Sequence, residues 1–408
     1  MDKSAIWLWL SLHFGAGSSV YQKLFEYFGE VEAIYDSTDA DVVGIDFLNS
    51  SQKRKLLNKS LDQANEIIEW CNEHDVEIIT PADDKYPLPF RTIENYPAAI
   101  YCVGKMPNFQ MDVCISVVGT RKMSVYGQKN AYELGYGLAK GGAVVISGMA
   151  LGIDCTAQKG ALYAGGTTVA VLGSGIDVVY PRENLQLMQK IMKVGAVITE
   201  YPPHTPPNGS NFPVRNRLIS ALSIATVVVE ADMNSGSLIT AKCAARQGKD
   251  LFAFPGPVKN YLTAGTNQLL SEGAMVATSA IDVLERYLET HADSIDITAS
   301  KEKPVLKHKA WNMSPLSDSY VNTESGVPQR PSTPNRMILD TEKPVRFDPV
   351  NLSEKERILF DKMQYGKAIS LDMLADDEID PSELSTIISM LEIAGAIQSI
   401  PGGYYIKK

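Results

Sequence analysis

Short apolar segments alternate with helical stretches through the middle of the chain, from about residue 76 to residue 254. The apolar segments are residues 76–79, 113–118, 143–147, 168–172, 196–199, 225–230 and 251–254. Amphipathic stretches such as residues 126–140 and 153–164 separate most of them. Continuously apolar strands between helices are typical of a parallel sheet covered on both faces. The alternation therefore predicts a doubly wound, mostly parallel α/β domain over residues 73–290.

The first 72 residues have a different pattern, with helical spacing and glycine-containing turns. Gly15-Ala16-Gly17 lies between two short predicted helices, Val43-Gly44-Ile45 precedes a third, and residues 56–70 form a fourth. Two helix-turn-helix units suggest a helix-hairpin-helix or SAM-like domain. Its backbone amides could bind a DNA phosphate, but the acidic composition favours a small helical cap.

Beyond residue 290, two further regions are predicted. Residues 291–350 are rich in Pro, Ser and Thr and lack sustained periodicity, which indicates a flexible linker. Residues 351–408 begin with two helical segments and end with a predicted hairpin over 396–400 and 404–407. This order resembles a winged helix. Its many acidic side chains favour a protein-contact or regulatory role over DNA binding.

The formal net charge of −10 argues against a nucleic-acid-binding protein only if the chain is a single domain. Residues 113–283 have 14 basic and 10 acidic residues, whereas residues 1–112 have 9 basic and 18 acidic residues. The predicted core is therefore the one basic region, with acidic regions on both sides.

Several classes of protein are disfavoured by the composition. No apolar run approaches the ~20 residues of a membrane helix, and the amino terminus lacks a basic leader, so we expect a cytoplasmic protein without membrane contact. The five cysteines are scattered and the five histidines lack metal-ligand spacing. We therefore predict neither disulfides nor a metal site, and no cofactor.

Four glycine-containing loops follow predicted strands, where open parallel sheets bind their ligands. They contain Gly119-Thr120-Arg121, Ser147-Gly148, Gly173-Ser174-Gly175 and Ser235-Gly236-Ser237. Glycine lets a phosphate approach backbone amides at a helix N-terminus. None of the loops matches the dinucleotide or Walker fingerprint, which disfavours a dehydrogenase or a P-loop NTPase.

The segment Asn211-Phe212-Pro213-Val214-Arg215-Asn216-Arg217 is the most suggestive part of the sequence. Pro213 favours an extended Phe212, so the next helix is expected to begin near Val214, with Arg215 and Arg217 in its first turn. Cations there oppose the helix dipole unless an anion is bound. Phe212 could stack on an unpaired base, or could pack against its own helix.

Other charged residues leave alternatives open. Arg121 could clamp a phosphate or pair with Asp154 or Glu230, and Lys242 could face the ligand or solvent. Together with Asp177, these carboxylates lack an activated nucleophile or a histidine partner. Helix capping and arginine orientation explain them more simply than catalysis.

These residues resemble one family, the DNA-processing protein DprA, also called Smf. The resemblance covers about residues 78–284 and rests on Val118-Gly119-Thr120-Arg121, Ser147-Gly148-Met149-Ala150-Leu151-Gly152-Ile153-Asp154, Tyr180-Pro181-Arg182-Glu183-Asn184, Phe212-Pro213-Val214-Arg215-Asn216-Arg217-Leu218-Ile219-Ser220, Val228-Val229-Glu230-Ala231, Ser235-Gly236-Ser237-Leu238-Ile239-Thr240-Ala241 and Phe254-Pro255-Gly256-Pro257.

The resemblance implies an extended Rossmann-like domain that binds single-stranded DNA without sequence preference. Such proteins protect incoming strands in natural transformation and load the RecA recombinase on them, usually as homodimers, and they are not known as enzymes. It implies Arg121 as a phosphate clamp, Phe212 as a stacking platform, and Arg215 with Arg217 as phosphate contacts. Further DNA contacts are expected from Gly119, Thr120, Ser147, Gly148, Asn211, Asn216, Ser235, Gly236, Ser237 and Lys242.

One departure and one alternative accompany this resemblance. The family commonly has basic residues just before the Phe-Pro step, whereas Asn208-Gly209-Ser210 supplies none. The alternative is a nucleotide phosphoribohydrolase on a related Rossmann scaffold. Its hallmark P-G-G-x-G-T is absent from this sequence, where the comparable turn begins at Ser235. The sequence also lacks the dinucleotide fingerprint and the catalytic histidine that an NAD-dependent oxidoreductase would need.

Overall fold

A computed structural model describes residues 3–304 and, of the C-terminal region, residues 357, 359–361, 363, 368–370, 384, 387, 388, 391, 396–400 and 404–407. Contacts divide the chain into two units, Met1–Ile338 and Leu339–Lys408, and each is described here by itself. The finer division of the first unit at residue 72 stays a prediction.

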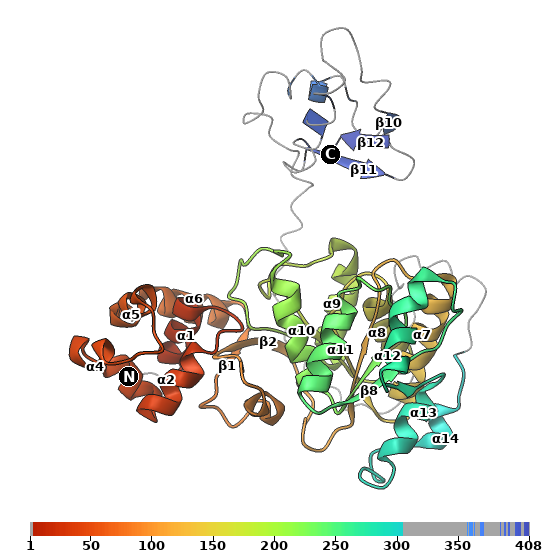
Figure 1. Ribbon diagram of the computed structural model, residues 1–408, viewed down its shortest axis with the longest axis horizontal. Helices are drawn as coiled ribbons and strands as arrows, with labels where there is room; N and C mark the ends of the chain where they lie inside the picture. The colour runs from red at the N-terminus through yellow and green to blue at the C-terminus, as the bar shows by residue number, and fades with distance from the viewer. Residues whose placement is uncertain are drawn as a thin grey trace. The chain divides into compact units, whose positions relative to one another are not determined.

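A nine-stranded sheet forms the centre of the first unit (Figure 1). The strands are β1 (Glu77–Ile79), β2 (Ile100–Gly104), β3 (Cys114–Val118), β4 (Val144–Ser147), β5 (Thr168–Val171), β6 (Ala196–Thr199), β7 (Ala225–Val228), β8 (Asp250–Ala253) and β9 (Met275–Val276), in the order β1-β2-β6-β5-β4-β3-β7-β8-β9. The pairs from β6 through β9 are parallel, whereas β1 and β2 pair antiparallel. The predicted mostly parallel sheet is confirmed, and β2 and β9 were not predicted.

Helices cover both faces of this sheet. They are α7 (Val125–Lys140), α8 (Ile153–Tyr163), α9 (Leu185–Val194), α10 (Asn211–Ala221), α11 (Ser237–Arg246), α12 (Ala264–Ser271), α13 (Ala280–Leu284) and α14 (Ile297–Ser300), with 3-10 turns η1 (Leu88–Thr92), η2 (Arg182–Asn184), η3 (Tyr261–Thr263) and η4 (Glu285–Tyr287). Successive residues of a strand point to opposite faces. In β5, Val169 and Val171 therefore pack with Leu218 of α10, and Ala170 packs with Ile191 of α9.

The amino-terminal region forms six helices, α1 (Lys3–Phe14), α2 (Val20–Phe28), α3 (Val31–Asp36), α4 (Asp39–Val43), α5 (Ser50–Leu57) and α6 (Asp62–Glu73). The single helix predicted over residues 56–70 is wrong, because the chain leaves helical conformation at Asn58. The carbonyl of Asn58 accepts a hydrogen bond from the indole of Trp9 at 2.7 Å, which fixes this break against α1. Leu8 of α1 packs into the same apolar cluster as Val197 of β6.

The first part of the predicted linker contains a short helix, α14. Ile295 is buried, and Ile297 of α14 packs against the apolar cluster that includes residues of α7, so the chain is packed on the core at these positions. Residues 305–350 of the predicted linker lie outside the described residues. In the second unit, β11 (Ile397–Ile400) and β12 (Tyr404–Lys407) form the predicted hairpin, and β10 (Ala368–Ser370) extends it. The helices predicted for a winged helix are described at too few positions to test them.

The parallel strands change their direction of progress at β3. From there, β4 lies on one side and β7 on the other. In open α/β sheets this arrangement leaves a crevice at the carboxyl ends of the strands. Among the described residues, no helix is long and apolar enough to cross a membrane.

Candidate nucleic-acid interface

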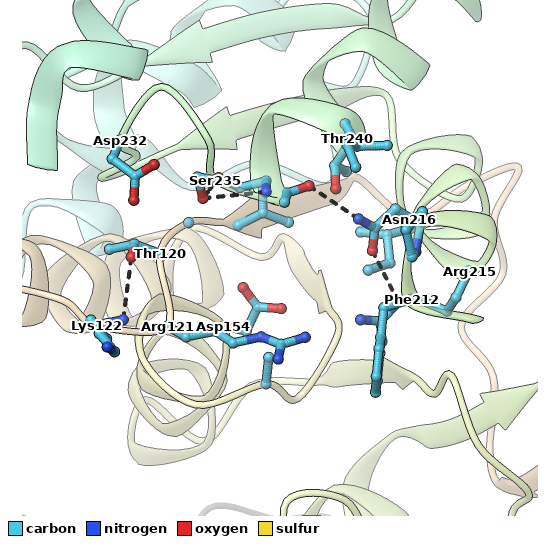
Figure 2. A pocket seen from close by; sticks show the side chains of 18 of the residues that line it. Thr120, Arg121, Lys122, Asp154, Phe212, Arg215, Asn216, Asp232, Ser235 and Thr240 are labelled. Carbon is cyan, nitrogen blue, oxygen red and sulfur yellow. Dashed lines mark hydrogen bonds between the residues drawn. The ribbon is translucent and has the colours of Figure 1, made fainter. Parts of the chain in front are cut away.

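A cleft of about 620 Å³ lies at the carboxyl ends of the strands on both sides of β3. Its walls come from the loops after six strands, β3 through β8, and from the first turns of α10 and α11. Figure 2 shows these side chains converging from the different loops. The cleft therefore occupies the position that the strand order favours.

Most of the predicted site residues line this cleft. They are Gly119, Thr120, Arg121, Phe212, Arg215, Asn216, Ser235, Gly236 and Ser237. The five that do not belong to its lining are Ser147, Gly148, Asn211, Arg217 and Lys242. The structure thus brings together predicted site residues from Gly119 to Ser237, which are about 120 residues apart in the sequence.

Phe212 is the centre of an aromatic and cationic group on one wall of the cleft. The guanidinium carbon of Arg121 lies 5.1 Å from the centre of the Phe212 ring. The Tyr180 ring lies 5.4 Å from that ring at an angle of 35°. Arg121 is exposed and extends toward Phe212 (Figure 2). An exposed guanidinium beside a partly exposed ring is a suitable arrangement for a phosphate and its base.

Arg215 lines the cleft but is a buried residue, with 3% of its surface exposed. Its Nη1 donates to the carbonyl of Gly148 at 3.0 Å and to that of Val171, and its Nε donates to Asn216 at 3.1 Å. Burial lowers the pKa of Arg215 to about 10, so the side chain is still charged near neutral pH. Its main contacts fasten α10 to the loop after β4 and to β5.

Arg217 is not among the residues that line the cleft, and its expected role as a phosphate contact stays a prediction. Its Nη2 donates to both carboxylate oxygens of Glu200, with 2.8 Å to Oε1, and only 11% of the Arg217 side chain is exposed. Burial raises the pKa of Glu200, and the charge of Arg217 opposes that shift. A Cβ on Gly17 would lie 2.6 Å from Val214 Cγ1, so the amino-terminal turn packs directly on this part of α10.

The start of α10 also differs from the prediction. The helix begins at Asn211, so Phe212 is helical and Pro213 occupies the third position. Proline is tolerated there because the amides of the first turn have no intrahelical acceptor. Arg215 and Arg217 consequently lie in the second turn, where the helix dipole is weak. Their sequence position alone therefore gives no evidence for a bound anion.

Three of the other predicted polar residues order the loops. Ser147 is fully buried and donates its hydroxyl to the carbonyl of Val117 at 2.6 Å, so this proton is used within the sheet, and the expected contact with DNA stays a prediction. Asn211 donates to the carbonyl of Gly173 at 3.1 Å. Asn216 donates to the carbonyl of Gly236 at 3.2 Å, which joins the starts of α10 and α11.

The loop before α11 presents small polar groups to the cleft. Ser235 and Ser237 form a hydroxyl–hydroxyl hydrogen bond of 2.8 Å, and the helix begins directly after Gly236. The amides of Ser235 and Ser237 donate within the loop, to the Asp232 carbonyl at 3.1 Å and to the Ser235 hydroxyl at 3.4 Å, so the hydroxyl pair is the group that faces a ligand. Lys242 is exposed on the same helix but does not line the cleft. Gly148, in the loop after β4, does not line the cleft either, and its amide donates to Asp154 at 3.1 Å.

The three carboxylates that we interpreted as structural have structural partners. Glu230 accepts the Ser124 amide at 2.8 Å and the Ser124 hydroxyl at 2.6 Å, at the start of α7. Asp177 accepts the His204 amide at 2.8 Å. Burial raises the pKa of Asp154, and Arg215 and the amide of Gly148 oppose this shift. These contacts support the interpretation of the three groups as loop and helix anchors.

Among the lining residues that were not predicted, one cation and two aromatic residues could contact a ligand. Lys122 is exposed next to Arg121, Tyr180 pairs with Phe212, and Tyr261 follows β8 with 72% of its surface exposed. The only sequence signal for them is their place after a strand end. That signal was used for glycines and charges but not for aromatic side chains.

Comparison with known proteins agrees with this geometry. The sequence profile of the family described as DNA recombination-mediator protein A matches residues 77–288, the core that carries the cleft. The chain belongs to this family. The matched residues contain the strands β1 to β9 and the helices α7 to α13.

Individual members of the DNA recombination-mediator family are similar over the same region. Protein Smf of Escherichia coli is 37% identical over 255 residues, which is 60% of this chain and 66% of that protein, just under two thirds. DNA processing protein DprA of Streptococcus pneumoniae is 39% identical over 205 residues, 50% of this chain and 72% of that protein. The X-ray structure of the latter protein matches with a TM-score of 0.61 and 31% identity, covering 70% of this chain and 98% of the solved one.

Proposed function

We propose that this family member is a recombination mediator that binds single-stranded DNA without sequence preference in the cleft. The observation that carries the proposal is the exposed Arg121 guanidinium beside the partly exposed Phe212 ring. A guanidinium binds phosphate, and an aromatic ring stacks on any base, so the pair needs no particular sequence. Of the Ser235–Ser237 hydroxyl pair, one hydroxyl donates to the other, and the second hydroxyl provides a further donor across the cleft.

The burial of the side chains changes the set of residues that we assign to DNA binding. Arg121 and Lys122 are exposed cations of the cleft, and Phe212 is the stacking residue. Arg215 holds the wall in place, and Arg217 holds α10 against Glu200, the residue after β6. Fewer cations face the DNA than the sequence suggested, so stacking should provide a large share of the affinity.

Arg121 gives the sharpest test. Binding of fluorescent single- and double-stranded oligonucleotides is measured by anisotropy at several salt concentrations. We expect a preference for single strands, and Arg121→Ala should weaken binding and reduce the slope of log affinity against log salt by about 0.7, the contribution of one phosphate contact.

The matched control is Arg246→Ala, which removes an exposed arginine at the far end of α11, about 14 Å along the helix axis from Ser237. Its salt slope should equal that of the wild type. An unchanged slope in Arg121→Ala would contradict the assigned clamp. Incubation with nucleoside monophosphates tests the phosphoribohydrolase alternative, and release of free base would favour it.

The finer role is also proposed from the family resemblance: protection of incoming strands, loading of RecA during natural transformation, action as a homodimer, and location in the cytoplasm. Adding the protein to RecA and single-stranded DNA should speed filament formation, and Arg121→Ala should reduce that effect. Light scattering after gel filtration tests the dimer. Absence of any acceleration by the wild type would contradict RecA loading.

A further inference from the structure

Tyr261 lies in the lining of the cleft with a largely free ring on a firmly held backbone. The ring belongs to a residue that is 72% exposed. Asn260 accepts the amide of Leu262 at 3.1 Å, and the buried Thr263 donates its hydroxyl to the carbonyl of Pro257 at 2.9 Å. The loop is therefore ordered by its polar side chains and not by the Tyr261 ring.

The sheet order places this ring at the opposite end of the cleft from Tyr180 and Phe212. Tyr180 follows β5, Phe212 follows β6, and Tyr261 follows β8. In the sheet, the strands from β5 to β8 lie in the order β5-β4-β3-β7-β8. The strands β5 and β8 are therefore four strand spacings apart, or about 19 Å. Arg121 and Lys122 follow β3, which lies between β5 and β8 in the sheet, and the Arg121 guanidinium reaches from there to the Phe212 ring.

This order along the sheet edge is aromatic, cationic, aromatic. Single-stranded nucleic acids are bound by such combinations of cations for the backbone and rings for the bases. Covering a large, rigidly held, exposed ring with a flat apolar surface is favourable, because it removes apolar area of both groups from water. An unpaired base of a strand that already contacts Phe212 and Arg121 is the surface that this cleft can supply.

We propose that Tyr261 is a second base-stacking platform, so that a single strand crosses the sheet edge from Phe212 past Arg121 to Tyr261. The proposal rests on the proposed function of the cleft. The ligand of the Tyr261 end is a nucleobase of any identity, located several nucleotides from the base at Phe212. The bound nucleic-acid strand therefore runs perpendicular to the β-strands.

The test compares full-length wild type, Tyr261→Ala and Tyr261→Phe on oligo(dT) of graded length, from about 4 to 16 nucleotides. Tyr261→Ala should weaken binding of the longer oligonucleotides by about 5- to 150-fold, the range for loss of one stacked base. Its salt slope should stay that of the wild type, because no phosphate contact is lost. Tyr261→Phe should retain wild-type affinity, and the shortest oligonucleotides should not distinguish the three proteins.

Tyr27→Ala is the matched control, since Tyr27 is an exposed tyrosine, 57% exposed, on the amino-terminal helix α2. It should bind like the wild type. Photocrosslinking with 5-iodouracil at successive positions should give a Tyr261 adduct several nucleotides from the Phe212 adduct.

Equal affinity of wild type and Tyr261→Ala at every length would overturn the second platform and leave the proposed function intact. An equal loss at every length would overturn its place at the far end. Failure of the wild type to bind any single strand would overturn both proposals, and in that case the Arg121 test fails as well.

Discussion

Arg217 and Glu200 form a buried ion pair behind the wall of the cleft. Glu200 follows β6, and Arg217 lies in the second turn of α10. Gly17 of the amino-terminal region packs against the same stretch of α10, beside Val214. The pair thus joins the sheet to the helix that carries Phe212, at the place where the amino-terminal helices contact both.

Breaking this pair should cost stability but not a phosphate contact. Arg217→Ala leaves the carboxylate of Glu200 buried without its cation, and such losses cost about 3–5 kcal/mol of unfolding free energy. Urea denaturation followed by tryptophan fluorescence measures the change. Lys85→Ala is the control, because the Lys85–Glu77 pair is exposed and should contribute no more than about 1 kcal/mol. If Arg217 contacts DNA after all, the salt slope of DNA binding will fall in the folded variant.

The contact of the amino-terminal turn with α10 can be tested by two glycines of that turn. Gly17 and Gly15 both have positive φ, 71° and 78°. Alanine at either position should cost about 1–2 kcal/mol for the left-handed backbone. Gly17→Ala should cost more, because its Cβ would lie 2.6 Å from Val214 Cγ1, whereas nothing lies within 4 Å at Gly15. Equal unfolding free energies of the two variants would contradict the close packing.

Arg215 and Arg121 should differ in their effect on stability. Arg215→Ala removes the donor for the carbonyls of Gly148 and Val171, and each buried acceptor left without a partner costs about 1–3 kcal/mol. Arg121 is exposed, so Arg121→Ala should change the unfolding free energy by less than about 0.5 kcal/mol. Thermal and urea unfolding of both variants provide the comparison. A destabilised Arg121→Ala would show that its side chain also anchors the loop.

Lys59 predicts a pH dependence of stability in the amino-terminal helices. Its ammonium lies over the Trp9 and Tyr35 rings, and burial lowers its pKa to about 8, against an opposing effect of Asp36. Between about pH 8 and the ordinary value of 10.5, the unfolded chain holds a proton that the folded chain lacks. The unfolding free energy should therefore rise with pH through this window.

Urea titrations of the wild type and Lys59→Gln at several pH values isolate this contribution, because the other titrating groups are shared. The difference in unfolding free energy should change between pH 8 and 10.5 in favour of the wild type. A difference that is constant over this window would show that the lysine keeps its ordinary pKa in the folded protein.

The sequence allowed the parallel sheet and the position of the cleft to be predicted, because both follow from local patterns. Apolar strands such as β3 and β6 are visible as runs, and their carboxyl-end loops are marked by small residues. The direction of a side chain is not visible in this way. Ser147 ends β4 and Ser235 lies in the loop after β7, yet Ser147 donates into the sheet and Ser235 faces the cleft.

Partners distant in the sequence account for the remaining differences. Nothing local to Arg217 indicates Glu200 or the turn at Gly17, which lies two hundred residues earlier. The rule for residues before proline favoured an extended Phe212, but a proline in a first helical turn is also compatible with helix. The helix therefore begins at Asn211, three residues before the predicted start at Val214.

The cleft draws its walls from six loops between residues 118 and 262, and none of them forms it alone. A ligand bound there is lost on any opening that separates these loops, so its binding energy is linked to the cooperative unfolding of the whole core. Saturation with ligand should therefore slow amide hydrogen exchange across the central strands, far from any atom that the ligand touches. Ligand binding in the cleft would then be detectable as slower amide exchange in the interior of the sheet as well as at its edge.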